Sequence, residues 1–148
     1  NQINPDFIRL RSLHAVPGTD LHDKLLKGDF IPLSDNDVVK EIRSLIEGLE
    51  GIESCVVSDH ILNLLEEVEG KLPQDKEKIL SVIDRYLALP EKDQLIFRLG
   101  RRKGIYRSVD DFSDSRLYNS LRETVEEYEL REPGQLDKAL SLMMHSYI

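Results

Sequence analysis

The chain has 148 residues, and its 40% hydrophobic content is enough for the core of one domain, or of one small domain and part of another. Its formal net charge of −8 disfavours non-specific nucleic-acid binding, which needs a basic footprint. No apolar run reaches the roughly 20 residues that a membrane-spanning helix needs, and one cysteine excludes an internal disulfide and fits a reducing, cytoplasmic compartment.

The first predicted element is a strand over residues 7–13. Period-two alternation puts Arg9 and Arg11 on one face and Ile8 and Leu10 on the other. A compact domain rarely begins on a buried strand without a lead-in. We therefore expect this strand to complete a sheet supplied by another stretch of polypeptide, so that the chain is the C-terminal part of a longer protein.

A strand–helix–strand pattern follows. A short helix is predicted over residues 20–27 and ends at Gly28. Ser34 is the predicted N-cap of the next helix, with Asp37 as the acid of a capping box. That helix carries an apolar stripe at helical spacing: Val38, Val39, Ile42, Leu45, Ile46 and Leu49. A second strand is predicted over residues 52–57.

The remainder of the chain reads as helices. Ser58 is expected to cap a helix that ends at Gly70, and helices are expected after Pro73 and after Pro90. A loop is expected from Gly100, followed by a long helix and a last helix beyond Pro133-Gly134. The predicted fold is mainly α with two short β-strands. A domain boundary is expected near residue 70, between a unit over 1–70 and a helical domain over 71–148.

Two small groups of polar residues are candidates for binding. Arg9 and Arg11 together suit a carboxylate or a phosphate, because the planar guanidinium binds both in a bidentate way. The alternative for them is the solvated face of an edge strand. His60 and Asn63, one turn apart at a predicted helix start, could face a ligand, although helix capping by Ser58 explains this stretch more simply. We predict neither a catalytic group nor a metal site.

The stretch over residues 98–107 is the one basic cluster of an acidic chain. It holds five cations, namely Arg98, Arg101, Arg102, Lys103 and Arg107. Such a cluster can contact the phosphates of RNA or of a nucleotide. The alternative is that these cations pair with the many nearby acids.

Several stretches of the chain resemble the end of the catalytic core in radical S-adenosylmethionine (SAM) proteins, most closely the coproporphyrinogen-oxidase-like and elongator-like branches. The first of them are Asn4-Pro5-Asp6-Phe7-Ile8-Arg9-Leu10-Arg11-Ser12-Leu13 and Pro17-Gly18-Thr19-Asp20-Leu21. Lys27-Gly28-Asp29-Phe30 and Asp37-Val38-Val39-Lys40-Glu41-Ile42-Arg43 match as well. The resemblance is closer over residues 4–70 than over 71–148.

This resemblance implies the last strand–helix unit of a partial (β/α) barrel, followed by a helical accessory domain. It also implies a [4Fe–4S] cluster and SAM in the full-length parent, but not in this chain, whose single Cys55 cannot supply three thiolates. Because (β/α) barrels place their active sites at the carboxyl ends of strands, Arg9, Arg11 and His14 become candidate cofactor-binding residues. Candidate contacts to substrate or partner are His60, Asn63, Arg101 and Arg102.

The expected partner is the barrel of the same parent protein, and the chain by itself is expected to be inactive. Self-association through the exposed strand over 7–13 is expected when that barrel is absent. Two other functions stay open: a helical protein-interaction module, and an RNA-contacting module that uses residues 98–107.

Overall fold

A computed structural model of the protein describes residues 3–144. The elements in chain order are β1 (Phe7–Arg9), α1 (Asp20–Lys27), α2 (Asp35–Gly48), β2 (Cys55–Val57), β3 (Gly70–Lys71), α3 (Lys76–Leu87), α4 (Glu91–Arg102), the 3-10 helix η1 (Val109–Ser113), α5 (Ser115–Arg131) and α6 (Leu136–Met144). The fold is mainly helical with short strands, as the sequence predicts. No helix in this part of the chain is long and apolar enough to cross a membrane.

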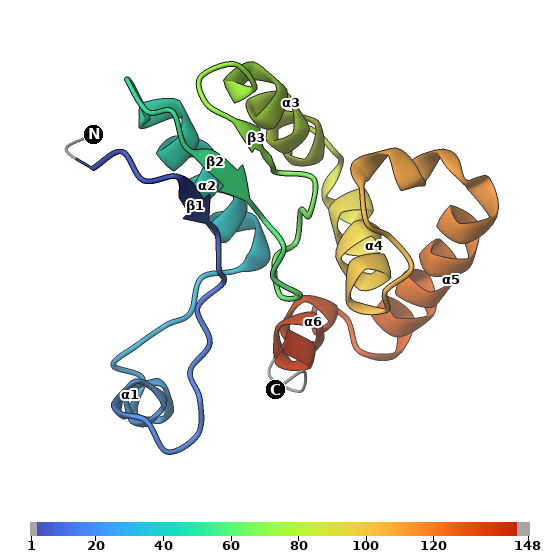
Figure 1. Ribbon diagram of the computed structural model, residues 1–148. Coiled ribbons are helices and arrows are strands. Elements are labelled where there is room, and N and C mark those ends of the chain that lie inside the picture. Colours follow the sequence, from blue (N-terminus) through green and yellow to red (C-terminus); the bar gives the residue numbers. More distant parts are fainter. Residues whose placement is uncertain (1–2, 145–148) are drawn as a thin grey trace.

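The strands form one small sheet in the order β1-β2-β3. β1 and β2 run parallel, with Phe7 opposite Cys55 and Arg9 opposite Val57. Since α2 lies between them in the chain, they form a βαβ unit, and α2 and α3 lie behind the sheet (Figure 1). The antiparallel β3 was not predicted, because Gly70-Lys71 is too short to show alternation.

One hydrophobic core extends over both predicted parts of the chain. It includes Leu10 and Val56 from the sheet, Val39 and Ile46 from α2, and side chains from every later helix as far as Leu140. The polypeptide on both sides of residue 70 therefore contributes to the same core.

Helix α4 continues past the point where the sequence predicted a loop. It runs through Gly100 to Arg102 and ends in a Schellman motif, in which the N–H of Gly104 donates to Arg101 and that of Ile105 to Gly100. Gly104 has a φ of +68°, which favours glycine. Gly100 does not break the helix because its missing side chain makes room for Tyr106 and Leu121.

The close approach at Gly100 leads to a prediction. A Cβ there would lie 2.3 Å from Tyr106 Cδ2 and 2.9 Å from Leu121 Cδ1, and Tyr106 is fully buried. We expect Gly100→Ala to lower the free energy of unfolding by about 1–3 kcal/mol through overpacking. The matched control is Gly48→Ala, also helical, where a Cβ meets nothing within 4 Å. Urea unfolding that ranks the two variants equally would contradict this packing.

The helix predicted from Ser58 to Gly70 is wrong, because residues 58–69 form turns and extended chain. Four consecutive residues, Leu62, Asn63, Leu64 and Leu65, are buried, whereas a helix at the surface buries only one stripe. A buried non-helical segment needs partners for its backbone carbonyls. Side chains of this segment and of α4 supply them.

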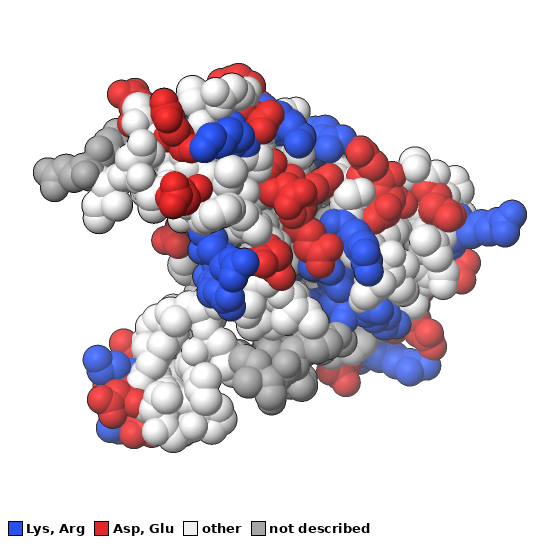
Figure 2. Space-filling model, in the orientation of Figure 1, with Lys and Arg blue, Asp and Glu red and all other residues white. Residues whose placement is uncertain are grey.

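Residues 11–34 form an arm that carries α1 away from the body of the molecule (Figure 1). The predicted bounds of α1 are confirmed: Thr19 caps its start, and Gly28, in the left-handed region, ends it. None of its residues is buried. The arm exposes apolar side chains, namely Leu13, Val16, Leu26, Ile31 and Leu33. Figure 2 shows charged side chains at its outer tip and an uncharged surface on the side toward the body.

Candidate functional site

The candidate site lies where the parallel strands β1 and β2 end. Because the two strands run the same way, their carboxyl ends meet at one edge of the sheet. Beyond β1 the chain continues to Leu10, whose N–H donates to Val57 at 2.9 Å. Beyond β2 it enters residues 58–65, which we name the strand-end loop.

Asn63 ties the strand-end loop to the end of β1. Its side chain, 3% exposed, accepts hydrogen bonds from the N–H and the hydroxyl of Ser12, at 3.2 and 3.1 Å. Its amide nitrogen donates to the Leu10 carbonyl at 3.0 Å and to Ser58 Oγ at 3.1 Å. These four bonds use the full capacity of a carboxamide. Asn63 is therefore a structural clamp whose carboxamide is fully engaged within the chain, and the expected ligand contact stays a prediction.

Side chains satisfy the carbonyls of four consecutive residues in the strand-end loop. Arg102 donates to Leu62 at 3.1 Å, and Arg101 donates to Asn63 and to Leu64 at 3.3 and 3.1 Å. The hydroxyl of Ser58 donates to Leu65 at 2.8 Å. These bonds replace the ladder of a helix, which explains why an apolar segment with helical spacing stays non-helical here.

The arginines of α4 are buried in an ionic network. The carboxylate of Asp35, 6% exposed, accepts from Arg98 Nε at 3.0 Å and from Arg102 Nη2 at 2.6 Å. Arg98 also pairs with Asp137 of α6. Burial alone would lower the pKa of Arg98, but the carboxylates of Asp35 and Asp137 raise it above its ordinary value. Arg98 therefore stays charged.

This network corrects the expected basic surface over residues 98–107. Three of the five cations, Arg98, Arg101 and Arg102, are at most 8% exposed. Arg101 pairs with Glu66, and the other two pair with Asp35. The alternative interpretation, ion pairs with acids of the chain, is confirmed for these three arginines. Arg101 and Arg102 thus hold the loop from inside and do not offer their charges to phosphates.

The outer side of the site carries the exposed candidates. Arg9 Nη2 pairs with Asp59 Oδ2 at 3.0 Å, and both side chains are about half exposed. Arg11 is exposed and has no ion-pair partner among residues 3–144. On the opposite face Leu10 is buried, and Ser12 is hydrogen-bonded to Asn63. The alternation predicted for this strand is therefore confirmed.

Two histidines lie near these strand ends. His60 directly follows Asp59 in the strand-end loop and is half-buried, with an Nδ1 that is buried and lacks a hydrogen-bond partner in the described part of the chain. His14, also half-buried, lies in the arm beyond β1. The structure thus brings Arg9, Asp59 and His60 to one edge, with Asn63 and Arg101 behind them.

The chain's own residues do not fit an iron–sulfur cluster. Cys55 is the only cysteine, so it offers one thiolate where a cluster needs three or four. Within residues 3–144 no three His, Cys, Asp or Glu side chains gather as metal ligands do. No chemical step can therefore be assigned to a cluster held by this chain alone.

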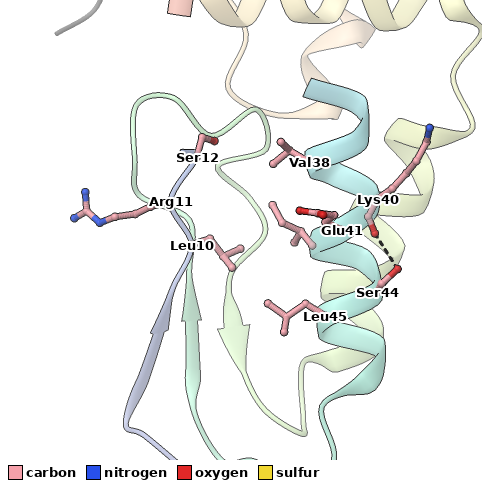
Figure 3. A pocket seen from close by; sticks show the side chains of 9 residues that line it. Leu10, Arg11, Ser12, Val38, Lys40, Glu41, Ser44 and Leu45 are labelled. Carbon is pink, nitrogen blue, oxygen red and sulfur yellow. Dashed lines mark hydrogen bonds between the residues drawn. The ribbon is translucent and has the colours of Figure 1, made fainter. Parts of the chain in front are cut away.

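An open groove lies beside the strand ends, with a volume of ≈ 590 Å³. Its walls are the chain beyond β1 and one side of α2 (Figure 3). Val38 and Leu45 of α2 point across it toward Leu10, whereas Arg11 points away from α2. Leu45 is 46% exposed, so the groove leaves apolar surface uncovered.

Asp35 is the residue that sequence reasoning missed. Ser34 and Asp37 were recognised as a cap, and Ser34 Oγ does accept from Asp37 N–H at 3.2 Å. The missed signal is spacing: Asp35 is four residues before Val39, on the buried stripe of α2. An acid on a buried stripe indicates a cation on a neighbouring element.

Comparison of the chain with protein-family models, with curated proteins and with solved structures finds no match in any of the three. Its function therefore has to be inferred from the residues and contacts of the site.

Proposed function

We propose that the chain is the C-terminal part of a cytoplasmic radical SAM iron–sulfur protein. In this proposal β1, α2 and β2 extend a partial (β/α) barrel, and α3–α6 form a helical domain that covers the barrel mouth or recognises substrate or partner. The cluster and SAM are bound by the rest of the parent, because Cys55 is the only thiol here. The chain alone is inactive.

The observation that carries this proposal is the unpaired edge of β1. β1 is parallel to β2, joined to it through α2, and has no other strand neighbour within residues 3–144. A free strand edge presents a row of N–H and C=O groups with which a strand of further polypeptide can pair. The uncovered apolar residues of the arm, Leu26 and Ile31 among them, are what an element that packs against further polypeptide would carry.

The position of the exposed polar residues supports the same function. In (β/α) barrels the residues that contact substrate and cofactor lie at the carboxyl ends of the strands. Arg9, Asp59 and His60 lie at the carboxyl ends of β1 and β2. Arg9 is oriented by its ion pair with Asp59, and its exposed guanidinium can bind a carboxylate or a phosphate. Arg11 and His14 stay predicted cavity residues.

The proposal is tested on the protein encoded by the whole reading frame that contains this chain. We expect a CxxxCxxC motif before β1. The protein purified without oxygen should show the electron paramagnetic resonance signal of a reduced [4Fe–4S] cluster and should convert SAM to 5′-deoxyadenosine. Arg9→Ala in that protein should weaken SAM binding or cleavage, whereas Arg116→Ala, at an exposed arginine of α5 outside every candidate site, should not. A reading frame without such cysteines, or a protein without iron, would overturn the proposal.

A further inference from the structure

Within residues 3–144, the backbone N–H and C=O groups of β1 form strand-pairing hydrogen bonds only on the side that faces β2. Asp6 accepts from Cys55 N–H at 2.8 Å, and Leu10 donates to Val57 at 2.9 Å, so the even-numbered residues face β2. In a parallel ladder the alternate residues direct their N–H and C=O groups the other way. Those of Phe7, Arg9 and Arg11 therefore point to the free edge. An extended segment can pair with them by adding a strand.

The two sides of this edge differ in chemistry. On one side lies the groove, where Val38 and Leu45 of α2 face Leu10 and Glu41 lies between them on the same wall (Figure 3). On the other side are the exposed Arg11, which has no acidic partner in the described residues, and Arg9. Since successive side chains of a strand point to opposite faces, a strand that fits here alternates apolar residues with acidic ones.

A second copy of the chain fits this edge poorly. Antiparallel pairings of two β1 strands centred on Arg9 or on Leu10 set arginine against arginine, and like charges directly opposite each other destabilise a sheet. A strand that places carboxylates opposite these arginines would instead stabilise the sheet. In these two registers charge therefore favours a heterologous strand over the self-association expected for residues 7–13.

We propose that the free edge of β1 and the adjoining groove bind an extended strand in which apolar residues fill the groove and a carboxylate meets Arg11. This rests on the part of the proposed function in which β1 joins another sheet, but it does not depend on an iron–sulfur cluster. The two proposals can therefore fail separately.

The test uses the 148-residue chain and two labelled seven-residue peptides, in which valine alternates with aspartate or with lysine. Fluorescence anisotropy should show that the aspartate peptide binds about tenfold more tightly than the lysine peptide. The lysine peptide replaces the favourable pair with Arg11 by a pair of like charges. Arg11→Glu should reverse this order. Arg107→Glu, an exposed cation on a distant loop, should leave it unchanged.

Backbone pairing is tested with N-methylated peptides. Methylation of the alternate amides that face β1 should abolish binding, while methylation of the other amides should not. Nuclear magnetic resonance should show the amides of Phe7, Arg9 and Arg11 shifting more than those of Ile8 and Leu10. Equal binding of both peptides, no binding of either, or a dimer through β1 in light scattering would each overturn the inference. So would shifts at Arg11 with SAM alone, which would assign that arginine to the cofactor.

Discussion

Asp35→Asn is expected to destabilise the protein more than any other single conservative change. The variant keeps the shape of the side chain but removes the negative charge that two buried arginines share, at 3.0 Å from Arg98 Nε and 2.6 Å from Arg102 Nη2. A buried charge left without its partner costs about 3–5 kcal/mol. We expect the free energy of unfolding, measured in urea, to fall by about that amount.

The control for this prediction is Glu127→Gln, which also removes one acid from an ion pair with arginine. Glu127 and Arg131 are 63% and 74% exposed on the surface of α5, where such pairs contribute little. Stability of the Glu127→Gln variant should be unchanged. If Asp35→Asn were equally harmless, the buried network would not hold α2, α4 and α6 together.

Asn63→Ala is the second change with a large expected effect. It removes four side-chain hydrogen bonds and leaves the Leu10 carbonyl and Ser58 without this partner in the interior. We expect the free energy of unfolding to fall by about 2–4 kcal/mol. The N–H of Leu10 should also exchange with solvent faster, because the end of β1 loses its clamp.

Asn119→Ala provides the matched control. Asn119 is exposed on α5, where alanine is the better helix former, so stability should stay the same or rise slightly. A loss in Asn63→Ala no larger than in this control would mean that Asn63 is free to contact a ligand, as the sequence alone predicted.

Local sequence signals were sufficient for the first two helices, α1 and α2. The caps Thr19 and Ser34 and the stop at Gly28 set the ends of α1 and α2 by bonds within a few residues, which a sequence displays directly. The alternation around Arg9 likewise predicted which side chains of β1 would be exposed.

The strand-end loop could not be predicted in the same way. Its apolar residues have helical spacing, but its conformation depends on Arg101 and Arg102, almost forty residues later in the chain. Nothing near Leu62 reveals that these side chains will satisfy its carbonyl groups. Long-range polar contacts of this kind override local preference, and the same contacts turn an apparent basic surface into part of the interior.

Amide hydrogen exchange along β1 tests most directly whether this edge is completed by another strand. It compares the 148-residue chain with the protein encoded by the whole reading frame that contains it, which the proposal takes to be the full-length protein. In the chain alone, Leu10, bonded to Val57, should be protected, while Phe7 and Arg9 exchange quickly. In the full-length protein we expect all three amides to be protected. Fast exchange of Phe7 and Arg9 in both proteins would mean that the edge of β1 stays open and that β1 does not join a larger sheet.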